Sequence, residues 1–336
     1  MRPFVYERAT GPEHAAALLT SDPGATLLAG GTNLVDLMKL GVARPSLVVD
    51  INGLPYDRVD HRDDGSLVVG ATVRNSDLAG DPGVRRRFPL LSEALLAGAS
   101  GQLRARATTA GNLLQRTRCV YFQDIGKPCN KRAPGTGCAA VEGSHRDLAV
   151  LGTSDACVAS HPSDLAVALA ALDATVLVRP IGDGQGPSRI PLTDLYRLPG
   201  DTPDRETVLR RGDLVTGVEV PPPPVGAAMR YRKVRDRWSF AFAVVSVAVL
   251  VTLDEDGALR DVRLALGGVA PLPWRAREAE RLLTGRRPTR DLVRSAADAE
   301  FAAARPLPHN AFKVGLAADV LTETVLALAA PAGSER

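Results

Sequence analysis

Hydrophobic positions along this chain form short runs separated by glycine, proline and charged residues, a pattern typical of mixed helix and strand structure. Brief apolar runs predict strands at 26–29, 47–51, 67–73, 175–178 and 214–220. Broader apolar faces predict helices at 12–19, 34–40, 88–99 and 165–172. The first 220 residues therefore mix short strands with helices.

The character of the chain changes after the proline run 221–224, which is a stiff break and predicts a domain boundary. Beyond it, 228–237 reads as a basic strand with a solvated face, and the apolar runs 240–253 and 259–266 predict a hairpin around the turn 254–257. Helices are expected at 274–283, 290–304 and 309–329. We therefore expect a first domain at 1–224, with subdomains about 1–55 and 56–224 and an irregular loop at 113–160, and a small α+β domain at 225–336.

Composition and charge restrict the class of protein. The chain has 336 residues, of which 45% are hydrophobic and 24% charged, which is ordinary for a globular protein with a sizeable core. A net charge of +3 without basic blocks argues against a nucleic-acid partner, and the longest apolar run is too short to cross a membrane. Residues 1–20 show no signal-peptide pattern, so a reducing cytoplasm is the expected compartment.

A double glycine directly follows the first apolar strand, in the text Thr26-Leu-Leu-Ala-Gly-Gly-Thr-Asn-Leu34. A strand that leads through glycines into a helix can bring backbone N–H groups against a phosphate. The spacing is not that of the G-x-G-x-x-G dinucleotide fingerprint, so a Rossmann domain is not supported. Taken alone, the signal is weak, because a double-glycine turn is more often an ordinary turn than a phosphate site.

All four cysteines of the chain lie in one polar stretch, with nine, eight and eighteen residues between successive members, Cys119, Cys129, Cys138 and Cys157. Incidental buried thiols are disfavoured by this confinement, and disulfides by the expected compartment. Structural zinc favours cysteine pairs two to four residues apart, which are absent here. An iron–sulfur cluster held by four thiolates is favoured over zinc, although the spacing matches neither ferredoxin pattern. Five neighbouring cations could offset its negative charge: Arg116, Arg118, Lys127, Lys131 and Arg132.

Five short motifs occur in a specific order along the chain: Ala29-Gly-Gly-Thr-Asn-Leu34, Thr108-Thr-Ala-Gly-Asn112, His161-Pro-Ser-Asp164, Tyr231-Arg-Lys-Val-Arg-Asp-Arg237 and Leu266-Gly-Gly-Val-Ala270. With these motifs the chain resembles the FAD-binding subunits of the xanthine dehydrogenase, or molybdenum hydroxylase, family. The cysteine loop resembles the branch whose flavin subunit carries a [4Fe–4S] cluster, seen in bacterial aldehyde oxidoreductases and 4-hydroxybenzoyl-CoA reductase. The text around Cys119 and Cys129 is more similar to the former.

The resemblance implies a fold and a set of cofactor contacts. The fold would be α+β, a two-part FAD-binding domain of the vanillyl-alcohol oxidase type followed by a small α+β C-terminal domain. Backbone amides of one turn would surround the FAD pyrophosphate: Thr26, Leu27, Leu28, Ala29, Gly30, Gly31, Thr32, Asn33 and Leu34. From a second glycine turn, Thr108 and Asn112 would contact the flavin nucleotide. Asp164 would hydrogen-bond the ribityl or ribose hydroxyls of the FAD, and Lys233 would lie near the FAD. The four cysteines would hold the [4Fe–4S] cluster. The resemblance therefore strengthens the preference for a cluster over zinc.

The resemblance also implies a role without substrate catalysis in this chain, so no catalytic residue is assigned. A large partner with a molybdenum cofactor would oxidise the substrate, most simply an aldehyde, and a small [2Fe–2S] subunit would pass the electrons to the FAD held here. Alternatives are a flavin subunit of a hydroxybenzoyl-CoA reductase-like or xanthine dehydrogenase-like complex, a non-catalytic assembly subunit, and a self-contained flavin oxidase. A periplasmic location would follow if a partner carried a twin-arginine signal.

Overall fold

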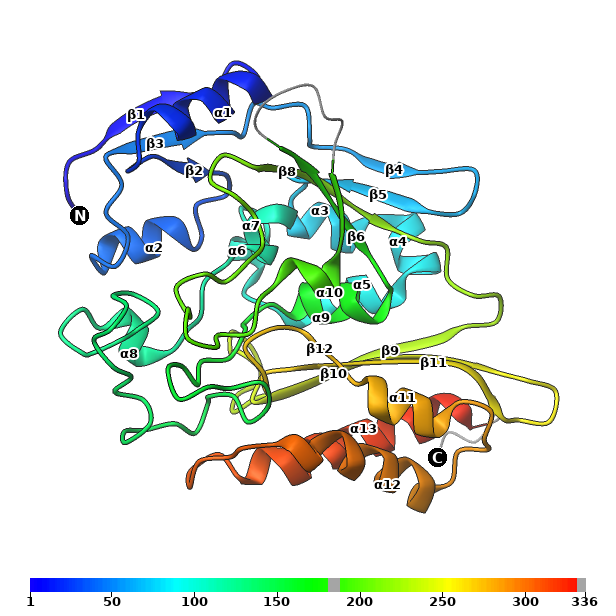
Figure 1. Cartoon of the computed structure of the whole chain (residues 1–336). Helices are drawn as coiled ribbons and strands as arrows, with labels where there is room; N and C mark the ends of the chain where they lie inside the picture. Colours follow the sequence, from blue (N-terminus) through cyan, green and yellow to red (C-terminus); the bar gives the residue numbers. More distant parts are fainter. Residues whose placement is uncertain (181–187, 331–336) are drawn as a thin grey trace.

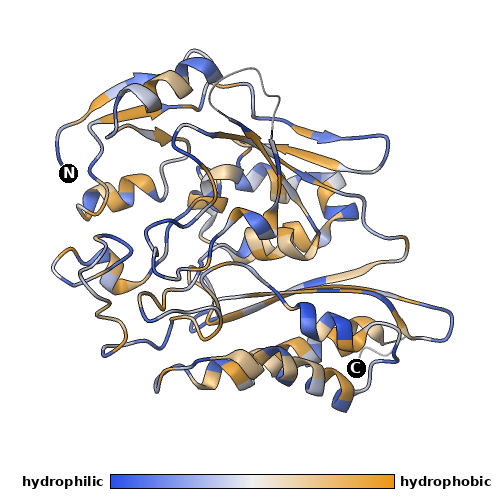
Figure 2. Ribbon diagram, in the orientation of Figure 1, coloured by the Kyte–Doolittle hydropathy of each residue, from blue (hydrophilic) through white to orange (hydrophobic). Residues whose placement is uncertain are grey.

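The chain folds into alternating layers of sheet and helix (Figure 1). The computed structural model describes residues 1–180 and 188–330. A five-stranded sheet, a helical layer containing α5 (Pro89–Ala97) and α9 (Asp164–Ala171), a four-stranded sheet and a final helical layer follow one another, and a small three-stranded sheet lies beside them. Apolar residues concentrate on the helices and strands that face each other, whereas the connecting loops are largely hydrophilic (Figure 2).

The N-terminal sheet is small and parallel, with the strand order β1-β3-β2. Its strands and helices have the bounds β1 Val5–Arg8, α1 Pro12–Ser21, β2 Thr26–Leu28, α2 Leu34–Lys39 and β3 Leu47–Asp50. Strand β3 is central and buried throughout, which explains its uninterrupted apolar text up to Asp50. The parallel arrangement places the carboxyl ends of β2 and β3 at one edge, and the double-glycine turn leaves β2 there.

The second sheet is antiparallel, in the order β4-β5-β8-β6-β7. Its strands are β4 Val59–His61, β5 Leu67–Gly70, β6 Thr175–Arg179, β7 Ser188–Pro191 and β8 Leu214–Val220. One large apolar core joins this sheet to α5, α9 and one face of the third sheet. The remaining helices of this part are α3 Asn75–Gly80, α4 Pro82–Arg87, α6 Gly101–Arg104, α7 Thr109–Leu113, α8 Val120–Gln123 and α10 Leu192–Leu195.

The C-terminal part is built on the antiparallel sheet β12-β11-β10-β9. Its elements are β9 Ala228–Val234, β10 Val245–Leu253, β11 Leu259–Gly267, β12 Trp274–Arg275, α11 Arg277–Leu283, α12 Arg290–Glu300, the 3₁₀ turn Phe301–Ala303 and α13 Phe312–Ala329. Alternate residues of β10 enter different cores: Ala248 and Leu250 face α9, whereas Val247 and Val249 face the last helices. Because both faces are covered, β10 is apolar at seven of its nine positions, and its two polar residues, Ser246 and Thr252, are also buried.

Three predictions about local structure were wrong, two in the C-terminal part and one before the cysteine loop. The expected strand 240–253 begins only at Val245, because Phe240 has a φ of 51° that is incompatible with an extended strand. The expected helix 274–283 begins at Arg277, because Trp274 and Arg275 pair with β11. The second glycine turn is in fact the short helix α7, whose first N–H groups are partly satisfied by the Thr108 hydroxyl.

The cysteine loop is irregular, as predicted, and has only the single turn α8 as regular structure between α7 and α9. Its distal part is attached to the C-terminal elements. Asn310 donates to the carbonyl oxygens of Leu148 and Ala149, and the buried Lys313 ammonium donates to those of Leu148 and Gly268 at 3.0 and 2.8 Å. Within 1–180 and 188–330, no helix is long and apolar enough to span a membrane.

Candidate cofactor site

The double-glycine turn lies against the chain segment that precedes α7. Gly31 has a φ of 77°, which favours glycine, and a Cβ on Gly30 would collide with the backbone carbonyl of Arg106. The turn lines a cavity of about 160 Å³ together with Thr108, Gly111 and residues 213–215. Of the predicted turn residues, those that line this cavity are Leu27, Ala29, Gly30, Gly31, Thr32, Asn33 and Leu34, whereas Thr26 and Leu28 are strand residues outside its lining.

A larger cavity of about 480 Å³ continues from Thr32 and Asn33 toward the C-terminal sheet. Besides these two turn residues, three of the predicted contact residues line it: Asn112, Asp164 and Lys233. Asn33 links the two cavities, and its side-chain Nδ2 is buried without a hydrogen-bond partner while its Oδ1 accepts from the N–H of Arg116 at 3.0 Å. A buried amide donor without a partner is costly, so this atom is suited to a bound acceptor.

Asp164 and Lys233 form a buried ion pair at the wall of the larger cavity. The distance between Lys233 Nζ and Asp164 Oδ2 is 2.8 Å, and the two side chains are 3% and 9% exposed. The Tyr231 hydroxyl donates to Asp164 Oδ1 at 2.6 Å. Burial and the nearby Asp164 carboxylate raise the pKa of Tyr231, which therefore stays protonated as a donor. Ser163, rather than Asp164, caps helix α9 by accepting from the N–H of Ala166, so the Asp164 carboxylate is available for these contacts.

Thr108 and Asn112 occupy different positions in this site. Thr108 is buried as the N-cap of α7 and borders the smaller cavity. Asn112 borders the larger one, and its Oδ1 accepts from Gln115 at 2.8 Å and from Ser163 at 2.7 Å. The structure thus brings Asn33, Asn112, Asp164 and Lys233 to one cavity, although they come from four separate segments of the chain.

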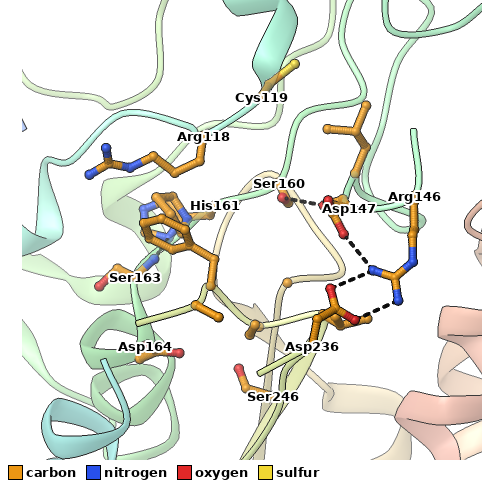
Figure 3. Close-up of a pocket in the computed structure, with 18 of the residues that line it drawn as sticks. Arg118, Cys119, Arg146, Asp147, Ser160, His161, Ser163, Asp164, Asp236 and Ser246 are labelled. Carbon is orange, nitrogen blue, oxygen red and sulfur yellow. Dashed lines mark hydrogen bonds and ion pairs between the residues drawn. The ribbon is translucent and has the colours of Figure 1, made fainter. Parts of the chain in front are cut away.

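A third cavity, of about 260 Å³, adjoins the second and shares Arg118, Asp164, Asp236 and Phe242 with it (Figure 3). Asp236 receives two hydrogen bonds from Arg146 at 2.8 and 2.9 Å. His161 is held by a 3.3 Å hydrogen bond from the N–H of Ser163 to its Nδ1, and burial lowers its pKa to about 4, so it is neutral. His161 is therefore a neutral, hydrogen-bonded loop histidine in this geometry.

Several residues that line these cavities were not predicted from the sequence. Phe240 and Phe242 line the larger cavity from the loop between β9 and β10, with Arg237 and Arg118 stacked on their respective rings. The positive φ of Phe240 is unusual for an aromatic residue and is found mainly at functional sites. The available sequence signal was the group of aromatic residues directly after the basic strand. In the structure one of them, Trp238, is 90% exposed.

The four cysteines come together around a small cavity of their own, lined also by Phe122 and Lys131. All four are free thiols, and Cys129 and Cys138 form an antiparallel backbone bridge. Burial raises the pKa of Cys119 to about 11, and it raises that of Cys157 against the opposing charge of Lys131. Among the described residues, no group of three or more His, Cys, Asp or Glu side chains is arranged to hold a metal ion.

Comparisons with known proteins identify the two domains of the chain. Residues 2–223 match the model of the FAD binding domain in molybdopterin dehydrogenase, and residues 201–328 match the CO dehydrogenase flavoprotein C-terminal domain. The chain is 50% identical, over 97% of its length and 98% of the relative's, to the aldehyde oxidoreductase FAD-binding subunit PaoB of Escherichia coli. It is 27% identical to the carbon monoxide dehydrogenase medium chain of Hydrogenophaga pseudoflava, over 90% and 88% of the two chains.

Solved structures agree with this assignment. The carbon monoxide dehydrogenase of H. pseudoflava that lacks the Mo-pyranopterin moiety matches with a TM-score of 0.74 and 25% identity over 98% of both chains. The glycine turn, the unpartnered Asn33 amide and the adjoining cavities fit an extended dinucleotide such as FAD. The expected architecture of an FAD-binding domain followed by a C-terminal domain is confirmed. The chain therefore belongs to the family of FAD-binding subunits of the molybdenum hydroxylases, oxidoreductases that include carbon monoxide dehydrogenase and xanthine dehydrogenase.

Proposed function

We propose that this chain is the FAD- and [4Fe–4S]-binding electron-transfer subunit of a molybdenum-containing aldehyde oxidoreductase. The observation that carries the proposal is its 50% identity, along nearly the whole of both chains, to an aldehyde oxidoreductase FAD-binding subunit. Its partners would be a large molybdenum-cofactor subunit and a small [2Fe–2S] subunit, and electrons from them would leave through this chain to an external acceptor. Medium chains and subunits of other dehydrogenase complexes among the relatives support such a multi-subunit arrangement.

The FAD contacts follow from the lining of the cavities. Backbone N–H groups of Gly30, Gly31 and Thr32 would bind the pyrophosphate, and the Asn33 amide would donate to an acceptor of the nucleotide. Asp164 would accept from ribityl or ribose hydroxyls, while the ion pair with Lys233 would hold that carboxylate in position. Bound FAD can accept electrons singly and release them as a pair. The chain's own contribution is to position it and to place a cation near it.

The cysteine cavity supports the second cofactor. A [4Fe–4S] cluster takes one thiolate at each of its four irons, so its ligands surround a space rather than converge on one atom. Cys119, Cys129, Cys138 and Cys157 surround such a space in an apolar pocket, and three of the four are buried. Cys119 would supply its thiolate from the N-cap position of α8. The backbone bridge between Cys129 and Cys138 holds those two cysteines side by side. This donor set fits a cluster bound within the loop.

Elemental analysis of anaerobically purified protein tests both cofactors. We expect about four irons, four acid-labile sulfides and one FAD per chain. Zinc without sulfide would overturn the cluster and leave the flavin assignment standing, whereas purified chain that binds no added FAD would favour a non-catalytic assembly role. Co-purification with a molybdenum subunit, followed by an assay with a panel of aldehydes, tests the substrate class. Oxidation of aldehydes by the isolated chain would contradict the dependence on partners.

A further inference from the structure

Lys131 is a buried cation at the wall of the cysteine cavity. It is 8% exposed, lines the cavity directly, and follows the ligand candidate Cys129 by two residues. Its ammonium is not directed to bulk water, since Nζ donates to the carbonyl oxygen of Pro203 at 2.9 Å and to Glu206 Oε1 at 3.0 Å. A lysine is rarely buried without such partners, so its position at this cavity is specified by the fold.

Glu206 holds Lys131 in place from a different part of the chain. It lies between α10 and β8, and its carboxylate bridges Lys131 and Arg116. Burial would raise the pKa of Glu206, but the charges of Arg116 and Lys131 outweigh that effect and keep the pKa below its usual value. The three side chains therefore carry two positive charges and one negative charge. Arg116 also stacks on Phe122, a fully buried residue that borders the cysteines.

We propose that Lys131, positioned by Glu206, supplies the fixed positive charge that sets the reduction potential of the cluster in the cysteine cavity. The inference rests on the [4Fe–4S] assignment made above. Reduction adds one negative charge to a group that is already anionic, so a nearby cation favours the reduced state. Inside a protein the effect is larger than in water, because the low dielectric screens the charge less.

Two substitutions make opposite predictions. Lys131→Met removes the cation and should lower the midpoint potential, whereas Glu206→Gln removes the compensating anion and should raise it. We expect about a tenfold change in the reduction equilibrium in each case, which is about 59 mV for a one-electron couple. Loosening of the loop would shift both variants in the same direction, because both would expose the cluster to water. Opposite signs therefore separate an electrostatic role from a structural one.

The measurement is a redox titration followed by optical or EPR spectroscopy on the FAD-loaded chain, with iron and sulfide determined for every sample. Lys131→Arg keeps the positive charge and should therefore keep the wild-type midpoint potential. Lys127→Met, which removes an exposed lysine of the same loop, should leave the potential unchanged because water screens that charge. If Lys131→Met loses its iron, Glu206→Gln still tests the proposal.

Two results would overturn the proposal, and they are distinguishable. Wild-type protein without iron and sulfide removes the cluster assignment and this inference together. Wild-type protein with four irons, whose potential does not change in Lys131→Met and Glu206→Gln or moves the same way in both, removes this inference alone.

Discussion

Lys233 Nζ lies 2.8 Å from Asp164 Oδ2, and this buried contact joins strand β9 of the C-terminal sheet to the first turn of helix α9. The pair borders the larger cavity, where we propose that FAD binds, so it connects the two parts of the molecule at the proposed cofactor site. Lys233 has a second partner in the carbonyl oxygen of Ala97, at 3.1 Å. A substitution in either residue should therefore affect both stability and flavin binding.

Removal of one partner should be more harmful to stability than removal of both. Asp164→Asn leaves the Lys233 ammonium buried without its counter-charge, and we expect a loss of roughly 3 kcal/mol in the free energy of unfolding. The double variant Asp164→Asn with Lys233→Met should recover much of that loss in stability. Its FAD affinity should nevertheless remain lower than that of the wild type. Chemical denaturation and flavin titration by fluorescence quenching measure the two effects. Equal FAD affinity in the wild type and the double variant would contradict the contact assignment.

Gly30→Ala should disrupt the first turn. A Cβ at this position would collide with the backbone carbonyl of Arg106, which cannot move away as a flexible side chain can. We expect at least a tenfold loss of FAD affinity together with a lower melting temperature. Gly53→Ala is the matched control, because no atom lies within 4 Å of a Cβ built there. FAD affinity in Gly30→Ala as high as in the control would show that the turn is not close to the cofactor.

Cys129→Ser should abolish the cluster and destabilise its loop. Cys129 is buried, it forms a backbone bridge with Cys138, and both residues line the cysteine cavity. A serine hydroxyl is a poor ligand for iron–sulfur clusters, so iron and sulfide should fall close to zero while FAD is retained. Limited proteolysis between 119 and 157 should become faster. Iron at the wild-type stoichiometry would refute the assignment of this ligand.

Lys313 predicts a specific dependence of stability on pH. Burial lowers its pKa from 10.5 to about 8 in the folded chain. Between about pH 8 and 10.5 the unfolded chain binds more protons at this residue than the folded chain, so the Lys313 contribution to stability rises with pH across that window. The comparison is with Lys313→Met, which should lack this rise when the free energy of unfolding is measured at several pH values. Parallel curves for the two proteins would contradict the low pKa.

The sequence predicted most of the strands, because apolar runs and the glycine turns between them are local signals. The order of the motifs pointed to the family. The FAD-binding domain and the C-terminal domain that follows it are confirmed. The residue roles remain proposals, and their pairing could not be read from the sequence. Strand 228–237 suggested a solvated basic face, yet Lys233 is buried because its partner Asp164 comes from a helix 69 residues earlier.

Glu206 and Phe240 show the same limit in different ways. Glu206 lies in an irregular segment without any motif, and only the fold brings it to Lys131, 75 residues before it. Phe240 belongs to an apolar run that continues into β10, so hydrophobicity alone assigned it to that strand. Its positive φ turns the chain toward the cavity instead. Long-range contacts and backbone exceptions at the site were the features that local patterns missed.

The attachment of the cysteine loop to Asn310 and Lys313 has a consequence for the order of events during synthesis. The carbonyl groups of Leu148 and Ala149 receive these donors from a helix region that leaves the ribosome more than 150 residues later. Until then, the segment beside Cys157 lacks the contacts that hold it in its final position. The loop is therefore completed only after residues 310–313 have been made. If the loop holds the proposed cluster, iron and sulfide would meet an open loop before these residues are made and a closed loop afterwards.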